Sequence, residues 1–438
     1  MKRFSIFSLI RERTVNNAIW IYVLQFFNTI VPLLTIPYVT RVIGAEMYGE
    51  FSIALNLVLY LQVIVEYGFI MSATRQLVLI QDDVQKINIL FSRVMVCRGI
   101  LLAICFFIYI TYINVSNKNY LHYCCIIVLM TTLIGYCTQQ NWFFQGVQDM
   151  KYISIISIVS RVISVLLIFI LVKKPSQILL YCVLYSITPV LNGIIGTIIV
   201  IKKYKVRLVK LTIDEIIEGF ISGWHVFLTQ FSSKIFVNVG VTILGLYVSS
   251  SIVGIYSAIQ KIPSIIVMVW SPISQVLFPI SSKRFSMSFC EGKKFIINVA
   301  KIVLPIFSII IITICLFARH VVCFAFGNQY VSGYHWVIPL CIWILVAIMN
   351  NFLGIQTLLA SGHDSEYGHC FLIGVVVTIL VNYVFIFRGG ADGASLAPLV
   401  SESILTLMLF CQIYKISKRE EYEKQENNGS LWHKTRSN

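Results

Sequence analysis

The sequence predicts an all-α integral membrane protein, and its composition, its long apolar runs and an internal repeat are the observations behind this fold class. Of the 438 residues, 58% are hydrophobic and only 12% are charged, and the mean hydropathy is +0.84. Soluble domains carry roughly 25% charged residues. The chain therefore lacks much of the charged surface that water requires, and we expect its apolar surface to face lipid.

The apolar runs predict about twelve transmembrane helices, because a helix needs about 20 mostly apolar residues to cross a bilayer. The predicted spans are residues 16–40, 48–72, 90–113, 119–143, 152–172, 177–201, 222–247, 252–280, 296–318, 334–359, 368–387 and 394–416. They divide into two six-helix bundles. The predicted parts are an N-terminal segment (1–15), an N-terminal lobe (16–201), a basic linker (202–221), a C-terminal lobe (222–416) and a polar tail (417–438) without regular structure.

The placement of Lys and Arg predicts that the N-terminal segment, the linker and the tail are all cytoplasmic, because cytoplasmic loops carry an excess of positive charge. With the N-terminus inside, few cations fall outside, namely Arg41, Lys118, Lys173, Lys174, Arg319 and Arg388. The net charge of +15 is thus accounted for by short loops. No basic tract is interleaved with aromatic residues outside the spans, so we predict no nucleic-acid partner.

The residues that could carry metal or cofactor chemistry are scattered. The 12 Cys show no metal-ligand spacing. The densest polar cluster contains His363, Asp364, Glu366 and His369, whose two His residues do not share a helix face. We interpret it as a solvated loop and predict no metal, no cofactor and no catalytic residue. No phosphate-binding loop is present, so ATP hydrolysis is not indicated.

A short pattern, Gly-x-aromatic-Ser, occurs at 49–52 and again at 254–257. Aligning the two copies also superposes Gln25-Phe26 on Gln230-Phe231 without a gap. Parallel six-helix repeats are typical of two-lobed transporters that bind substrate between the lobes. The alternative is chance similarity in an apolar sequence. We expect Gly49 and Gly254 to open tight outer hairpins, where glycine adopts conformations that other residues cannot.

Three cations, Arg161, Lys234 and Lys261, lie near the centres of predicted spans, where a charge costs roughly 2.5–3.5 kcal/mol. Each belongs to a polar stripe at helical spacing. The stripes are Ser157, Arg161 and Ser164; Gln230, Lys234 and Asn238; and Ser257, Lys261 and Ser264.

Glu66 is the only carboxylate that we place well inside a span. The excess positive charge therefore predicts a hydrated site for a phosphate-bearing ligand. The alternative is interhelical hydrogen bonding with snorkelling to the surface, which applies most to Arg93 and Arg98.

Several segments resemble the polysaccharide transporter family of the MOP superfamily, in particular the O-antigen flippases of the Wzx type. They are RVIGAEMYGEFS (41–52), VEYGFIMSATRQ (65–76), NWFFQGVQDMKYISIISIVSRVIS (141–164) and, in the second half, VGIYSAIQKIP (253–263). The match covers essentially residues 16–416. It puts family-motif positions at Arg41, Gly49, Glu66, Arg75, Trp142, Gln145, Gly146, Gly254 and Lys261.

The resemblance implies a V-shaped transporter of the MOP and MATE kind, which is not an enzyme. It further implies transport of an undecaprenyl-diphosphate-linked O-antigen repeat across the bacterial inner membrane during lipopolysaccharide biosynthesis. The implied partners are this lipid-linked oligosaccharide, membrane lipid, an O-antigen polymerase and a chain-length regulator. The family resemblance and the polar stripes together give the candidate substrate-binding residues, which are Arg161, Lys234, Lys261, Gln230, Asn238, Arg41 and Glu66.

Two other classes remain open at this stage. One comprises other MOP-type exporters, either a multidrug exporter, for which acidic cavity residues are expected, or a lipid II flippase, which usually carries extra helices. The other is a membrane enzyme such as an O-antigen polymerase or ligase, which needs a sizeable outer loop. The short outer loops and the repeat favour the flippase.

Overall fold

The computed structural model describes residues 2–115 and 119–435, with side chains described for 16–17, 19–115 and 119–419. Lys118 lies outside the described residues, as do the side chains of the N-terminal segment 1–15 and of tail residues 420–438. Every regular element in the described ranges is helical and none is a strand, which confirms the predicted all-α class.

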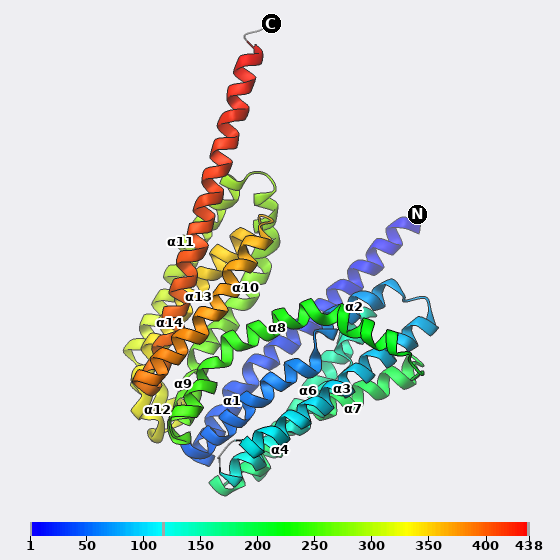
Figure 1. Cartoon of the computed structure of the whole chain (residues 1–438), viewed down its shortest axis with the longest axis vertical. Coiled ribbons are helices and arrows are strands. Elements are labelled where there is room, and N and C mark those ends of the chain that lie inside the picture. The colour runs from blue at the N-terminus through cyan, green and yellow to red at the C-terminus, as the bar shows by residue number, and fades with distance from the viewer. Residues whose placement is uncertain (1, 116–118, 436–438) are drawn as a thin grey trace. The chain divides into compact units, whose positions relative to one another are not determined.

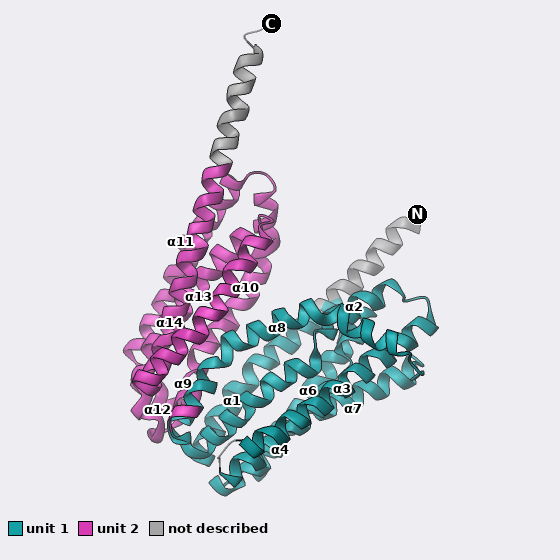
Figure 2. Cartoon of the chain, in the orientation of Figure 1, with its two compact units in different colours: residues 1–245, 249–254 teal, residues 246–248, 255–438 magenta. Residues whose placement is uncertain are grey.

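The chain divides into two compact units, drawn in different colours in Figure 2. Unit 1 comprises residues 1–245 and 249–254, and unit 2 comprises residues 246–248 and 255–438. Residues 222–245, which the sequence analysis assigned to the C-terminal lobe, belong to unit 1 by their contacts. The division into lobes 16–201 and 222–416 stays a prediction.

In unit 1, α4 packs against α1 and α7, and α6 packs against α1 and α7, so that these helices run side by side (Figure 1). The elements of unit 1 are α1 (Lys2–Glu66), α2 (Phe69–Leu79), α3 (Val84–Val115), α4 (Tyr120–Thr138), α5 (Asn141–Gly146), α6 (Met150–Leu171), η1 (Pro175–Gln177), α7 (Ile178–Lys203), α8 (Ile213–Tyr247) and the start of α9 (Ser250–Ile259).

In unit 2, α13 packs mainly against α14 and also against α10 and α11. Its further elements are α10 (Lys261–Phe285), α11 (Phe289–Leu316), α12 (Ala318–Phe326), the 3₁₀ helix η2 (Asn328–Trp336), α13 (Val337–Leu353), the π-helix η3 (Gly354–Leu359) and α14 (Asp364–Thr435).

Within the described residues, ten helices are long and apolar enough to cross a membrane. Two of them are each a pair of helices joined at a glycine with positive φ, Gly44 (79°) in α1 and Gly390 (52°) in α14. Glycine takes this conformation without a Cβ penalty. The number of twelve membrane crossings stays a prediction.

Large apolar side chains are exposed along these helices, including Leu316 (76%) and Phe324 (85%). Only 11% of the most apolar window of α11 is buried. Exposed apolar area on this scale is what lipid contact requires. The chain is a multi-pass membrane protein.

The predicted span 48–72 is wrong at its C-terminal end. The helix stops at Glu66, and Tyr67 and Gly68 adopt positive φ values of 46° and 74° before α2 begins. Gly68 faces the α8 backbone closely, since a Cβ there would lie 2.7 Å from the Val226 Cβ. Apolar composition carries no signal of such a packing-driven break.

The polar tail does not begin as irregular chain, because the backbone of α14 continues as helix to Thr435. The segment after Lys415 is rich in Lys and Glu. Both residues have high helix propensity, and Glu420 and Lys424 stand at the favourable i, i+4 spacing. Low hydrophobicity therefore did not predict the helical backbone of this segment.

Gly49 and Gly254 do not form the turns that the repeat predicted. The turn in the first copy falls at Gly44, and neither Gly49 nor Gly254 has a positive φ. Instead, a Cβ on Gly49 would lie 1.7 Å from the Ser250 carbonyl oxygen, and a Cβ on Gly254 would lie 1.8 Å from the Ala45 carbonyl oxygen. The two glycines allow the backbone around Gly49 to pack closely against the backbone of residues 250–254 within unit 1.

Candidate functional site

The candidate site in unit 1 is built around Arg161, near the middle of α6. Its Nη1 donates to Asn28 Oδ1 of α1 at 2.7 Å, so its hydrogen-bond partner is a neutral amide rather than a carboxylate. Tyr136 and Tyr185 lie within electrostatic range of the guanidinium. Arg161 is partly buried and keeps donors in excess of this contact, because a guanidinium has five N–H groups.

Lys234 of α8 is the second cation of this site. It interacts electrostatically with Glu66, the last residue of α1. The Glu66 carboxylate accepts a hydrogen bond from Gln62 Nε2 at 3.1 Å and also lies within electrostatic range of Arg98. Tyr136 is within electrostatic range of both Glu66 and Arg161. We call Arg161, Lys234 and Glu66 the polar region of unit 1.

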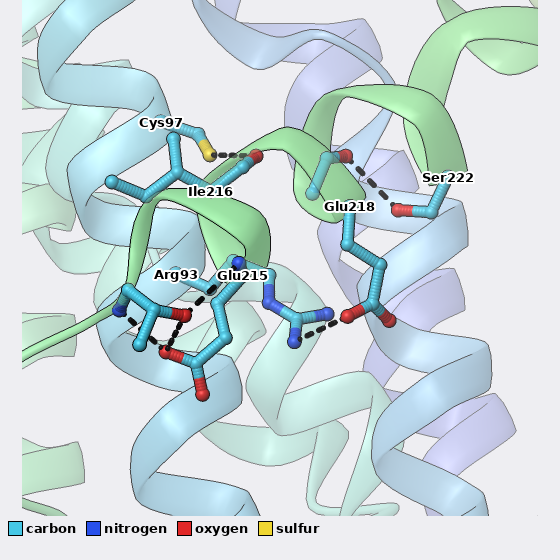
Figure 3. A network of polar contacts seen from close by, with 8 residues as sticks. Arg93, Cys97, Glu215, Ile216, Glu218 and Ser222 are labelled. Carbon is cyan, nitrogen blue, oxygen red and sulfur yellow. Dashed lines mark hydrogen bonds and ion pairs between the residues drawn. The ribbon is translucent and has the colours of Figure 1, made fainter.

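The start of α8, the helix that carries Lys234, is fixed to α3 (Figure 3). Thr212 and Glu215 form a capping box, in which the Thr212 N–H donates to Glu215 Oε2 at 2.8 Å and the Glu215 N–H donates to Thr212 Oγ1 at 3.4 Å. Further along, Arg93 Nη2 lies 2.9 Å from Glu218 Oε2. The Cys97 Sγ donates to the Ile216 carbonyl oxygen at 3.6 Å.

Arg93 and Arg98 both have structural partners, as the snorkelling and hydrogen-bonding alternative predicted. Arg98 is 1% exposed, and its Nη1 donates to the backbone oxygens of Gln139 at 2.7 Å and Tyr136 at 3.4 Å. It thereby connects α3 to the end of α4, where the helix has left backbone acceptors without partners.

Asn238, one turn after Lys234 on the predicted stripe, is held by hydrogen bonds to the backbone of α8 and to Asn56 of α1. The Asn238 Nδ2 donates to the Lys234 carbonyl oxygen at 3.0 Å, and the Asn238 carbonyl oxygen accepts from Asn56 Nδ2 at 3.3 Å. Gln230 is partly buried one turn before Lys234, and Arg41 is exposed on α1. Gln230 therefore shares the Lys234 face, whereas Arg41 lies on a different helix.

Lys261 belongs to unit 2, where it is the first residue of α10. Two residues of the predicted stripe differ in burial, because Ser257 is 5% exposed whereas Lys261 is exposed. Ser257 Oγ is also a buried hydroxyl without a partner among the described residues. α9 ends at Ile259 and α10 begins at Lys261, yet residues 250–285 together form one candidate membrane span, which agrees with the predicted span 252–280.

The family-motif residues of the WFFQG segment form core rather than a polar surface. Trp142 is fully buried, and its Nε1 donates to Gln140 Oε1 at 3.0 Å. A Cβ on Gly146 would lie 2.6 Å from Leu77 Cδ2, so the glycine lets α5 pack closely on α2. Gln145 is partly buried and Arg75 is exposed.

The end of this segment is held by Asp149. Its Oδ2 accepts from the Tyr204 hydroxyl at 2.8 Å and from Lys203 Nζ at 3.3 Å. Burial, together with the contact to Asp149, raises the pKa of Tyr204 to about 12. The motif thus joins α5, α6 and the end of α7.

Two buried carboxylates were missed by the sequence analysis, so the statement that Glu66 is the only one inside a span is wrong. Glu50 is 8% exposed, and its Oε2 lies 3.0 Å from His122 Nδ1. Its Oε1 accepts from the Ser250 hydroxyl at 2.5 Å. Glu402 of α14 is 7% exposed and pairs with Asn350. Glu402 interrupts a long apolar run, which is the signal that could have found it.

Comparison with known proteins gives a family and a fold. The family described as "Polysaccharide biosynthesis protein" matches residues 14–285. A protein of Escherichia coli (strain K12) named "Putative O-antigen transporter" is 25% identical over 397 residues, covering 90% of this chain and 95% of that protein. A protein of Shigella dysenteriae with the same name is 22% identical over 394 residues, covering 90% and 98%.

Two solved structures are similar in fold. One is described as "Lipid II flippase MurJ, inward closed conformation", with a TM-score of 0.73 at 12% identity, covering 91% of this chain and 87% of that chain. The other is an inward-facing multidrug resistance MATE family transporter of the MOP superfamily, with a TM-score of 0.65 at 14% identity and coverage of 90% and 99%. These likenesses concern the fold alone.

Proposed function

Because the chain belongs to the polysaccharide biosynthesis protein family, we propose that it is a flippase for an undecaprenyl-diphosphate-linked O-antigen repeat unit. It moves this substrate across the bacterial inner membrane by alternating access. It is a transport protein and not an enzyme. The relatives named as O-antigen transporters and the fold similarity to MurJ and MATE transporters support the proposal. Both termini lie in the cytoplasm, as the distribution of Lys and Arg predicts.

The observation that carries the proposal is the positive charge of the polar region in unit 1. Arg161 has a neutral hydrogen-bond partner, and Lys234 and Arg98 share the single carboxylate of Glu66. Isolated cations inside a span cost roughly 2.5–3.5 kcal/mol each. A diphosphate would offset that cost, because charge-assisted contacts from Arg and Lys to phosphate are the strong class of hydrogen bond.

In this mechanism the chain supplies charge rather than chemistry. Arg161 binds phosphate oxygens with the N–H groups that Asn28 does not occupy, and Lys234 adds a point charge within electrostatic range of Glu66. Gln230 and Asn238 continue the polar face of α8 toward the sugars, and Lys261 provides a further cation on unit 2. The prenyl chain stays in lipid, so only the polar headgroup needs the hydrated route.

The same charge argues against a multidrug exporter of cationic compounds, since such a ligand would be repelled by Arg161 and Lys234. An O-antigen polymerase and a chain-length regulator are the partners that would act on the exported repeat unit.

The test is complementation of a strain that lacks its O-antigen flippase. The wild-type chain restores surface polysaccharide, and Lys234→Glu and Lys261→Glu abolish it while the proteins stay in the membrane at wild-type abundance. Lys174→Glu, at an exposed loop lysine, is the matched control and keeps export. Export by both site variants at wild-type level would refute the cationic site, and failure of the wild-type chain in its native background would refute the function.

A further inference from the structure

A carboxyl group buried in unit 2 has a set of contacts that the proposed cationic site does not use. Glu402 lies near the centre of the last predicted span, 394–416, and is 7% exposed. Its Oε2 accepts a hydrogen bond from Asn350 Nδ2 of α13 at 2.5 Å. Asn350 is also 7% exposed, so the contact is shielded from bulk water.

The orientation of the Asn350 amide is fixed by a second contact. Its Nδ2 also donates to the Glu402 backbone carbonyl oxygen at 2.9 Å, and a carbonyl oxygen can only accept. The Asn350 Oδ1 points the other way and accepts from the Thr406 hydroxyl at 2.7 Å. The amide therefore presents N–H groups, not oxygen, to the carboxyl group.

This arrangement does not suit a metal cation. A bound hard cation needs several oxygen ligands that converge on one point, whereas the nearest side-chain partner of Glu402 turns a donor toward it. The indole of Trp343 on α13 lies beside the same carboxyl group. Its N–H, without a hydrogen bond among the described residues, is a second donor rather than a ligand.

No described Lys, Arg or His forms an ion pair with Glu402. The titratable group that faces it is Tyr367, at the start of α14, which carries no positive charge. An ionised carboxylate inside a span without a counter-charge is strongly disfavoured. A single proton on the carboxyl group removes that charge and leaves the contact with Asn350 intact.

The neighbouring backbone is irregular in a way that is frequent at functional sites. About one turn after Asn350, α13 passes into the π-helix η3, in which Gln356 is fully buried. The Gln356 Nε2 donates to the Ser274 carbonyl oxygen at 2.9 Å, and the Ser274 hydroxyl donates to Asn351 Oδ1 at 2.8 Å. A second polar cluster, which links α13 and η3 to α10, therefore begins at Asn351, the residue that follows Asn350 in α13.

We propose that Glu402 is a proton-binding site of unit 2, protonated in the resting protein, and that release and rebinding of this proton accompany the transport cycle. The bound proton neutralises one carboxylate, and its release leaves one negative charge beside Asn350. The coupling to transport rests on the proposed function, whereas the protonation of Glu402 does not.

Infrared difference spectroscopy of the purified full-length chain in lipid tests the protonation. At neutral pH we expect a carboxylic acid C=O band that is lost in Glu402→Gln and kept in Glu66→Gln. If Glu402→Gln does not fold, Asn350→Leu in the presence of Glu402 must shift the band, because it removes the N–H donor. A band that neither variant changes, or a band that sodium chloride abolishes and potassium chloride does not, overturns the proton site.

Complementation tests the coupling. We expect Glu402→Gln to lower surface polysaccharide at least tenfold at normal abundance, and Glu402→Asp to retain part of the export. Full export by Glu402→Gln overturns the coupling even when the infrared band is assigned to Glu402. Failure of the wild-type chain to restore export would instead remove the proposed function and leave the infrared assignment standing.

Discussion

Gly49 and Gly254 lie backbone against backbone. A Cβ on Gly254 would stand 2.9 Å from the Gly49 nitrogen and 1.8 Å from the Ala45 carbonyl oxygen. The two residues occupy equivalent positions in the two copies of the Gly-x-aromatic-Ser pattern. The first glycine of each copy thus takes part in one close backbone contact within unit 1, and this contact requires that both residues lack a Cβ.

Gly254→Ala is expected to destabilise the protein by about 1–3 kcal/mol, because the added methyl group meets backbone that cannot turn aside. Thermal unfolding in detergent measures the effect. Gly99→Ala is the matched control, since a Cβ there meets nothing within 4 Å, and helix propensity should raise stability by up to about 1 kcal/mol. Equal unfolding temperatures for the two variants would contradict the close packing of the motif.

Arg98→Ala is expected to reduce folded protein severely. It leaves the Gln139 and Tyr136 carbonyl oxygens without their donor, and an unsatisfied buried acceptor costs about 1–3 kcal/mol. Arg93→Ala is the comparison, because its partner Glu218 is 63% exposed and such pairs contribute about 0–1 kcal/mol. Yield of monodisperse protein after detergent extraction distinguishes them, and similar yields would mean that Arg98 does not connect α3 to α4.

Arg161→Ala is expected to abolish surface polysaccharide with little loss of folded protein, because its one hydrogen bond is to the neutral Asn28. Asn28→Ala retains the cation and should keep most export. Arg93→Ala should also export, since Arg93 lies in the contact between α3 and α8. Surface polysaccharide is measured by gel electrophoresis beside an immunoblot for the chain. Equal tolerance of Arg161→Ala and Arg93→Ala would show that α6 does not line the transport route.

Glu50→Ala is expected to lower stability by about 1–3 kcal/mol, because His122 and Ser250 both lose their buried partner. Glu46→Ala, at an exposed carboxylate one turn earlier on the same helix, should change it little. Detergent unfolding again reports the difference. A Glu50 variant as stable as the Glu46 variant would imply that the contact to α9 contributes nothing to the fold.

Some features of this protein follow from composition and periodicity alone. The all-α membrane class follows because a chain with 12% charged residues cannot cover itself with a water-compatible surface. The polar stripes of Arg161 and Lys234 could also be predicted from the sequence, because helical spacing decides which residues share a face. Glu402 could likewise have been identified as a lone acid in an apolar run, but the sequence analysis missed it.

Tertiary structure alone decided what each polar or small residue does. Arg98 and Arg161 are both cations within spans, yet one is bonded to backbone oxygens at the end of α4 and the other to a single neutral amide. Gly44 forms a turn and Gly49 a helix contact, five residues later on the same chain. These roles depend on partners distant in sequence, and local pattern carries no information about which backbone or side chain a residue will meet.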